Sequence, residues 1–160
     1  IDQEQKKLLV EMVEKQGRFG RKNGKGFYDY PEKGKGQKSL WSGIGALQPK
    51  HLDPDTLDVE ELKQRFLVVQ AVEAARTVED GVVVDPREAD VGSILGFGFA
   101  PFTGGTPSYI DFMGTKNFVA LCHKLEAKYG SRFTPPKLLL EMAEKGETFY
   151  GRFPPKKVAA

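Results

Sequence analysis

A seven-residue sequence occurs twice in this chain, and the repeat limits what the chain can fold into. Residues 9–15 have the sequence LVEMVEK and residues 139–145 have the sequence LLEMAEK, with five of the seven positions identical. A long helix-forming stretch precedes the second copy, whereas only eight residues precede the first. Because each copy of a repeat forms the same unit, we expect the first copy to end a helical unit that begins before Ile1. The chain would then be a C-terminal piece of a longer protein, and its start at a residue other than Met agrees with this, as it would with a processed protein.

The composition excludes several classes of protein. With 160 residues and an apolar fraction of 39%, the chain can form one domain with a core, or a small domain with a tail. A net charge of +2 gives no global reason to expect nucleic acid or an anionic membrane as a partner. A single cysteine, Cys122, forms neither an internal disulfide nor a thiolate metal cluster, and no apolar run is long enough to span a membrane. We therefore expect a cytoplasmic protein.

Hydrophobic residues recur with the helical period through most of the chain. The spacing predicts helices over residues 3–15, 58–78, 85–95, 106–113, 116–129 and 134–146. Asp58 and Asp85 stand at positions typical of N-caps, and glycines follow most of the helices. Only residues 82–84 have the composition of a strand, and there are three of them. We expect an all-α helical bundle with a long irregular N-terminal linker.

The same periodicity predicts which side chains are buried. In the first helix the apolar face should dock on a neighbouring unit and comprises Leu8, Leu9, Met12 and Val13. In the helix that starts after Asp58 the predicted face comprises Leu62, Phe66, Val69, Ala71 and Val72. In the helix over residues 116–129 it comprises Phe118, Leu121, Cys122, Leu125 and Tyr129. Residues 96–105 mix glycine, proline and phenylalanine, and so apolar a loop is expected to be packed.

Two glycine-rich segments invite a functional interpretation. The segment over residues 20–26 has the sequence GRKNGKG, and glycines and cations are what a phosphate-binding loop needs. A nucleotide loop, however, has a strand before its glycines and a helix after them, whereas here a predicted helix comes first, so a structural turn on the surface is favoured. Close packing of helices is likewise favoured for the second set, which comprises Gly96, Gly98, Gly104 and Gly105.

Side chains suited to acid-base or nucleophilic chemistry are few. His51 and His123 are 72 positions apart, and neither has partners at the spacing of metal ligands. His123 precedes Glu126 by three residues on a predicted helix, so the two could form an acid-base pair, although an exposed helical pair is favoured. Cys122 lies on the apolar stripe of that helix, which favours an inert core thiol over a nucleophile.

A run of cations in the N-terminal part is the remaining candidate. It comprises Lys15, Arg18, Arg21, Lys22, Lys25, Lys33, Lys35 and Lys38, and it is interleaved with Phe19, Phe27, Tyr28 and Trp41. Cations and aromatic rings together can bind single-stranded nucleic acid. They can equally meet the phosphates of a ligand such as coenzyme A, or keep a long linker in solution, which is the default interpretation.

Two motifs resemble those of a known family. The sequence GRKNGKGFY over residues 20–28 is similar to the motif that closes the helical domain of 3-hydroxyacyl-CoA dehydrogenases. Residues 96–105 and 109–111 resemble the glycine-aromatic run of a second such domain, as in the multifunctional β-oxidation α-subunits, which carry that domain twice. The resemblance implies a helical fold of the 6-phosphogluconate-dehydrogenase C-terminal type. It implies that residues 1–30 end a first repeat, residues 31–57 form a linker, residues 58–153 form a second repeat and residues 154–160 form a tail.

The resemblance also implies a reaction in which NAD accepts a hydride from a 3-hydroxyacyl-CoA. In the family an upstream Rossmann domain holds the NAD and the catalytic His/Glu pair, so we expect no cofactor in this chain and no catalytic role for its histidines. The substrate-positioning Asn of the family's Asn-Arg pair is replaced in the second repeat by Gln64, which is followed by Arg65. The second repeat is therefore expected to be a scaffold that shapes the acyl-CoA cleft, and the isolated chain to be inactive.

The expected contacts of this scaffold follow from the resemblance. We take Arg21, Lys22 and Lys25 as candidate substrate-binding residues, together with Leu95, which stands where some relatives have an aromatic residue at the substrate. The expected partners are the upstream Rossmann domain and first helical repeat, an acyl-CoA substrate and a thiolase β-subunit, with enoyl-CoA hydratase activity in the same enzyme. The alternative is a free-standing helical interaction module that binds a polyanion through residues 15–38.

Overall fold

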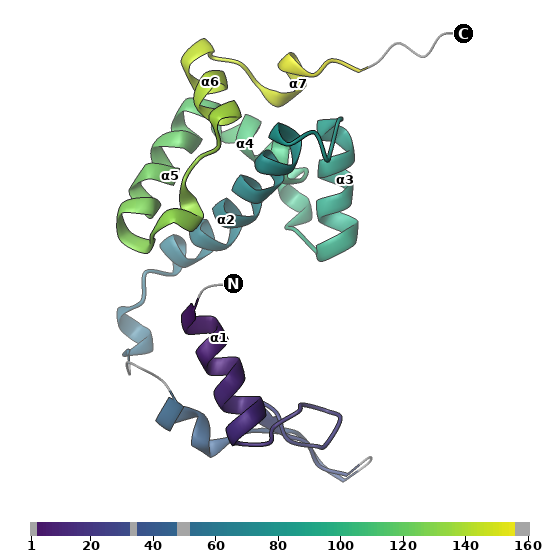
Figure 1. The fold of residues 1–160 in the computed structure, drawn as a ribbon, viewed down its shortest axis with the longest axis vertical. Helices are drawn as coiled ribbons and strands as arrows, with labels where there is room; N and C mark the ends of the chain where they lie inside the picture. The colour runs from purple at the N-terminus through teal and green to yellow at the C-terminus, as the bar shows by residue number, and fades with distance from the viewer. Residues whose placement is uncertain (1–2, 33–34, 48–51, 156–160) are drawn as a thin grey trace, which may run out of the picture. The chain divides into compact units, whose positions relative to one another are not determined.

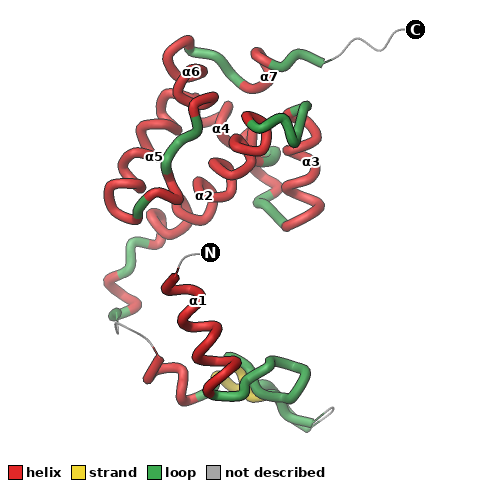
Figure 2. Tube along the Cα trace, in the orientation of Figure 1, coloured by secondary structure: helices red, strands yellow, loops and turns green. Residues whose placement is uncertain are grey.

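The computed structural model describes residues 3–32, 35–47 and 52–155 and divides the chain into two compact units, Ile1–Leu57 and Asp58–Ala160. Figure 1 shows the path of the chain through both units. Helices dominate, and in the described ranges the only strands are two short ones in the first unit, as Figure 2 shows in yellow. The predicted all-α class is therefore confirmed.

The first unit begins with the helix that carries the first copy of the repeat. Helix α1 (Gln3–Val10) continues as a π-helical turn (Glu11–Lys15), so the two together span the predicted helix. Gly17 follows with φ of +60°, a left-handed conformation that glycine adopts without steric cost. Within the unit Met12 is buried, whereas Leu9 is 52% exposed and Val13 is also exposed. The predicted apolar face is thus only partly covered by its own unit.

A small hydrogen-bonded structure occupies the part expected to be an irregular linker. Strands β1 (Tyr28–Asp29) and β2 (Ser39–Leu40) pair antiparallel, with Tyr28 opposite Leu40. Short 3₁₀ helices follow at Ser42–Leu47 and Pro54–Thr56. A two-residue strand is too short for the alternating pattern that identifies strands in a sequence, which is why this pair was not predicted.

The second unit is a helical bundle. It comprises α2 (Val59–Glu79), α3 (Pro86–Phe97), α4 (Thr106–Met113), α5 (Thr115–Tyr129), α6 (Lys137–Lys145) and α7 (Phe149–Arg152), with 3₁₀ turns at Pro101–Thr103 and Ser131–Phe133. The predicted caps are present: a carboxylate oxygen of Asp58 accepts the Glu61 N–H at 3.0 Å, and one of Asp85 accepts the Arg87 N–H at 2.9 Å.

The core of the bundle lies where α2, α4, α5 and α6 meet. Helix α2 packs on α4 and α6, and α5 packs on α6, as Figure 1 also shows. Its largest fully buried side chains include Phe118, Leu125, Leu139, Met142 and Phe149. The stripe predicted for α5 is confirmed at Phe118, Cys122 and Leu125, which are fully buried.

Two predictions about helix ends are wrong. Helix α3 does not stop at Gly96 but runs to Phe97, because the left-handed residue that ends it is Gly98, with φ of +74°. Helix α6 starts at Lys137, after Pro135 and Pro136, rather than at residue 134. Residues 82–84 form no strand. The N–H groups of Val82 and Val83 donate to the Thr77 carbonyl and continue the turn that ends α2.

Two predictions about burial are also wrong. Phe66 is exposed because the buried face of α2 follows the spacing of Val68, Val72 and Ala75, and a residue two positions before Val68 lies on the opposite side. Of the three phenylalanines in residues 96–105 only Phe99 is buried, whereas Phe97 at the end of α3 is exposed and Phe102 is 87% exposed. The apolar composition of this loop therefore does not make it a packed segment of its own unit.

Candidate functional site

The predicted basic residues of the first unit share one glycine turn. Gly20 and Gly24 have φ of +76° and +75°, and the Gly20 N–H donates to the Lys25 carbonyl at 2.7 Å, which closes the turn. The Asn23 side chain stabilises the turn, since its amide donates a hydrogen bond to the Gly17 carbonyl at 2.7 Å. Arg21, Lys22 and Lys25 are all exposed around it. The preference for a structural surface turn is confirmed.

Arg18 belongs to the interior of this unit rather than to a basic surface. Its Nε donates to the Gly26 carbonyl at 2.6 Å, its guanidinium pairs with the Asp29 carboxylate, and its Cζ lies 4.2 Å from the centroid of the Trp41 ring. Gly26 also lets the backbone of the glycine turn come close, because a Cβ there would lie 2.9 Å from the Gly20 Cα. Arg18 thus holds together segments that are distant in sequence and offers no charge to a ligand.

The other cations of the predicted run differ in the contacts that they form. Lys15 pairs with Glu11 and Lys35 with Glu32, both at 2.7 Å, and Lys38 Nζ lies 4.4 Å from the Tyr28 ring centroid. Lys33 lies outside the described residues. In the described part of the chain Lys22 and Lys25 form no ion pair. The run is therefore not a uniform polyanion-binding arm, and its exposed charge concentrates on the glycine turn.

Leu95, the fourth candidate, lies in the other unit. It projects from α3 and is 80% exposed. The structure thus brings Arg21, Lys22 and Lys25 together on one turn and places Leu95 on a helix of the second unit.

The residues considered for acid-base chemistry lie on the surface of α5 or in the core beside it. His123 Nδ1 is 3.3 Å from a Glu126 carboxylate oxygen, and His123 is exposed, so the exposed helical pair is confirmed. The Thr134 hydroxyl donates to the other Glu126 oxygen and is the main reason that the Glu126 pKa is lowered. Cys122 is fully buried, which confirms its predicted place in the core, and burial raises the pKa of its thiol to about 12. His51 lies outside the described residues.

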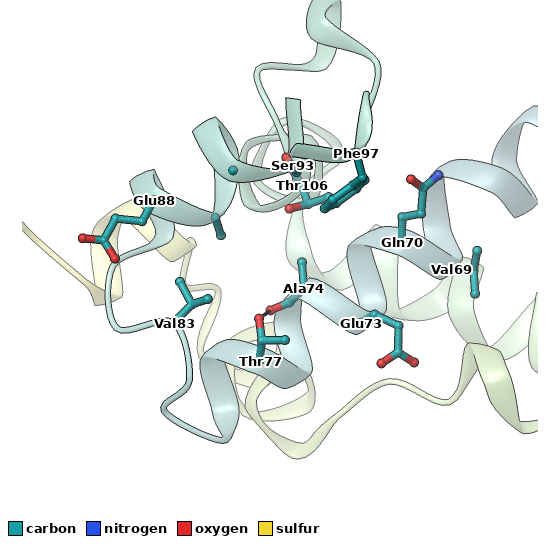
Figure 3. Close-up of a pocket in the computed structure, with 12 residues that line it drawn as sticks. Val69, Gln70, Glu73, Ala74, Thr77, Val83, Glu88, Ser93, Phe97 and Thr106 are labelled. Carbon is teal, nitrogen blue, oxygen red and sulfur yellow. Dashed lines mark hydrogen bonds between the residues drawn. The ribbon is translucent and has the colours of Figure 1, made fainter. Parts of the chain in front are cut away.

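A groove that was not predicted lies between α2 and α3 in the second unit. It has a volume of about 440 Å³ and is shown in Figure 3. Its α2 wall includes Val69, Gln70, Glu73, Ala74 and Thr77, and its α3 wall includes Glu88, Ala89, Gly92, Ser93 and Phe97. Thr106, the first residue of α4, also lines it. The small residues Ala89, Gly92 and Ser93 on one side of α3 are the sequence signal that could have indicated this open face.

A buried carboxylate fixes α3 to α4 and α7 beside this groove. Asp90 accepts the Ser108 N–H at 3.0 Å, the Ser108 hydroxyl at 2.6 Å and the Tyr150 hydroxyl at 2.7 Å. The pKa of Tyr150 is raised by burial and by this bond to Asp90. Gly105 must be glycine here, since it has φ of +116° and a Cβ would lie 2.3 Å from an Asp90 oxygen.

The close packing predicted for the glycines of residues 96–105 is confirmed for two of them. Gly105 lies against Asp90, and a Cβ at Gly104 would be 3.1 Å from the Ser108 Cβ. The prediction is wrong for Gly96 and Gly98, because a Cβ at either would meet nothing within 4 Å. Gly98 is instead required by its left-handed conformation at the end of α3.

Asp111 forms a second polar junction, between α4 and α7. Its carboxylate accepts the N–H groups of Phe149 and Tyr150 at 2.7 and 3.1 Å, so it caps the start of α7. Burial nevertheless raises the pKa of Asp111 above its ordinary value. Among the described residues no group of three or more His, Cys, Asp and Glu could hold a metal ion, and no helix is long and apolar enough to cross a membrane.

Comparison with known proteins identifies relatives of this chain, although no family model matches it. It is 42% identical over 134 residues, 83% of its length, to the fatty acid oxidation complex subunit alpha of Shewanella amazonensis. It is 42% identical over 136 residues to the subunit of the same name from Shewanella halifaxensis. The chain spans 19% and 18% of these two relatives, about a fifth of their length. Over most of its own length the chain is therefore a homologue of one part of the fatty acid oxidation complex subunit alpha.

Proposed function

We propose that this chain is a helical, scaffolding part of an NAD-dependent 3-hydroxyacyl-CoA dehydrogenase of fatty-acid β-oxidation. The observation that carries the proposal is the 42% identity to fatty acid oxidation complex α-subunits over 83% of the chain. The motifs over residues 20–28 and 96–111, which resemble those of 3-hydroxyacyl-CoA dehydrogenases, add the activity. In that reaction a hydride leaves C3 of the 3-hydroxyacyl-CoA for NAD, the hydroxyl loses its proton, and a 3-ketoacyl-CoA results.

The residues described here do not fit a dinucleotide. A pyrophosphate site of the Rossmann type needs glycines between a strand and the start of a helix. The glycine turn over residues 20–24 instead follows α1 and its π-helical turn and leads to strand β1. We therefore assign NAD, and the acid-base residues that act with it, to another part of the subunit.

The repeat supports an assignment of the units to two helical domains. In α6, the second copy, Leu139 and Met142 are fully buried, and α6 packs on α5 and α2. In the first copy Leu9, the equivalent of Leu139, is half exposed within its unit. We propose that residues 1–30 end a first helical repeat whose helices cover Leu9, that residues 31–57 link the repeats, and that residues 58–153 are the second repeat, followed by a tail.

A scaffolding role fits the residues at the place where the family positions its substrate. Gln64 on α2 stands there instead of Asn, and the neighbouring Arg65 stacks its Cζ 3.9 Å from the centroid of the Tyr129 ring on α5. Arg65 thus contributes to packing within the bundle. For substrate contact we propose that Arg21, Lys22 and Lys25 meet coenzyme A phosphates and that Leu95 borders the acyl-CoA cleft. The proposed partners remain the rest of the subunit and a thiolase β-subunit, in the cytoplasm.

A chimaera tests this proposal. The aligned segment of the Shewanella amazonensis subunit would be deleted, or replaced by the corresponding residues of this chain, and NADH formation from a 3-hydroxyacyl-CoA would be followed by absorbance. We expect the deletion to abolish NADH formation, the chimaera to retain it and the isolated chain to show none. Turnover by the isolated chain would refute the scaffolding role, and a folded but inactive chimaera would refute the assignment to the dehydrogenase.

A further inference from the structure

We propose that the groove between α2 and α3 binds the acyl chain of a neutral acyl thioester, with the Thr106 hydroxyl donating a hydrogen bond to the carbonyl oxygen. The inference rests on the proposed function for the choice of an acyl thioester among ligands of this chemistry. It assigns a ligand site to the second unit, which is otherwise only a scaffold. Three observations carry it: the open apolar space, one unpartnered buried hydroxyl and the charges along the groove.

The groove is open because small residues stand where two helices face each other. Ala74 on α2 and Ala89 and Gly92 on α3 line it, and a Cβ added at Gly92 would meet nothing within 4 Å. Its volume of about 440 Å³ lies within the range of small-molecule sites, roughly 300 to 1,000 Å³. Val69, Val83 and Phe97 complete walls that are largely hydrocarbon, which suits an alkyl chain.

Thr106 supplies the polar contact. It is 0% exposed, and its hydroxyl is a buried side-chain oxygen without a hydrogen-bond partner in the described part of the chain. Its backbone N–H already donates to the Ser93 hydroxyl at 3.3 Å, and the nearby Asp90 carboxylate is occupied by Ser108 and Tyr150. Figure 3 shows Thr106 lining the space between α2 and α3. Because a buried hydroxyl without a partner is unfavourable, a ligand oxygen that accepts from it would restore the missing bond.

The charges along the groove distinguish a thioester from a fatty acid. Among the described residues, those that carry a charge and line it are Glu73 and Glu88, and both are acidic. Glu73 is paired with Arg76, whereas Glu88 is exposed and forms no ion pair among the described residues. A ligand carboxylate would be repelled by Glu88, whose charge is not paired among the described residues, while a thioester carbonyl carries no charge. The ligand is therefore an acyl chain that ends in a neutral carbonyl.

The first experiment measures binding to the 160-residue chain by isothermal titration calorimetry at pH 7. The probes are the dodecanoyl thioester of N-acetylcysteamine, which is neutral and has no phosphates, and dodecanoate. We expect saturable binding of one thioester per chain. Dodecanoate should bind about tenfold more weakly, because its carboxylate is repelled by a glutamate near the surface of the groove. Absence of saturable thioester binding, or equal binding of the two probes, would overturn the proposal.

Variants then locate the site. Gly92→Leu fills the groove and should reduce thioester affinity by more than about tenfold, and because leucine favours a helix more than glycine does, α3 stays folded. Thr106→Val removes the hydroxyl at nearly constant shape and should cost about fivefold, whereas Thr106→Ser keeps the hydroxyl and should bind like the original chain. Ala120→Leu, on an exposed position of α5, is the matched control and should change nothing. A chain that binds equally well with Leu at position 92, or with Val at position 106, would refute the site.

The two proposals fail separately. Binding of the phosphate-free thioester involves neither NAD nor hydride transfer, so its absence together with NADH formation by the chimaera would refute the groove and leave the proposed function standing. Binding by the chain together with an inactive folded chimaera would refute the proposed function and keep the ligand site. If the groove instead receives another helical segment, the thioester will show no binding that Gly92→Leu weakens. In that case the proposal is wrong.

Discussion

The two copies of the repeated sequence share five of seven residues but lie in different surroundings. In α6 the second copy is a regular α-helix whose Leu139 is 0% exposed between α5 and α2. The first copy starts in α1, continues as a π-helical turn and leaves Leu9 half exposed within its unit. The local sequence therefore specifies a helix with an apolar stripe, whereas what the stripe contacts depends on helices supplied from elsewhere.

The largest expected effect compares these two leucines. Leu139→Ala should lower the free energy of unfolding of the second unit by about 3 kcal/mol, because it empties a fully packed site. Leu9→Ala should lower that of the first unit by less than about 1 kcal/mol, since half of this side chain already meets solvent. Urea titration measures both: the single tryptophan, Trp41, reports on the first unit, and far-UV circular dichroism is dominated by the helices of the second. Equal losses would show that the copies have the same surroundings.

Two glycines provide the next comparison. Gly105→Ala should destabilise the second unit by about 2 kcal/mol, because it combines a left-handed conformation with a collision against Asp90. Gly17→Ala in the first unit carries only the conformational cost of about 1 kcal/mol, since a Cβ there would meet nothing within 4 Å. The same urea titrations distinguish them, and the ranking would be contradicted if Gly17→Ala were the more harmful.

The two arginines that follow the copies should differ for the same reason. Arg18 is buried against Asp29 and the Gly26 carbonyl, so Arg18→Met should destabilise the first unit by about 1.5 kcal/mol. Arg152 pairs with Glu141 and Glu147 but remains partly exposed, so Arg152→Met should cost about 0.5 kcal/mol or less. High salt should weaken the Arg152 contribution more than that of Arg18, and the opposite salt dependence would contradict the assignment of burial.

Features that depend on neighbouring residues along the chain could be predicted from the sequence. The N-caps at Asp58 and Asp85 and the glycine that follows α5 were correct, because each involves contacts within one helical turn. The error at Phe66 and the exposed Phe97 and Phe102 have the opposite origin. Their burial depends on which face of one helix meets another helix, and local periodicity allows more than one face.

The candidate sites follow the same division. The glycine turn that carries Arg21, Lys22 and Lys25 was predicted because its glycines are close in sequence. The groove was not, because α2, α3 and Thr106 meet only in the folded bundle. Arg18 was counted among surface cations, since its partners Gly26, Asp29 and Trp41 are 8 to 23 positions away. Composition identifies a cation but not whether the fold buries it.

The smallest effect concerns two glutamates with lowered pKa values. The pKa of Glu61 is held below its ordinary 4.5 mainly by hydrogen bonds from Lys128 and Tyr129, so this carboxylate ties α2 to α5. The pKa of Glu11 is lowered mainly by Lys15, four residues along the same helical segment. A carboxyl group whose pKa is lower in the folded than in the unfolded state stabilises the fold above its unfolded pKa, and this contribution is lost as the pH falls through the folded pKa.

Glu61→Gln should therefore reduce the acid sensitivity of the second unit below about pH 4.5, where the original chain loses the carboxylate contribution. Glu11→Gln should change the acid sensitivity of the first unit less, because Lys15 is exposed and water screens a pair within one helix. Urea midpoints between pH 3 and 7 for the two variants and the original chain measure both effects. Since Glu61 joins two helices and Glu11 joins residues of one, a larger pH effect at Glu11 would mean that local pairs stabilise this protein more than contacts between helices do.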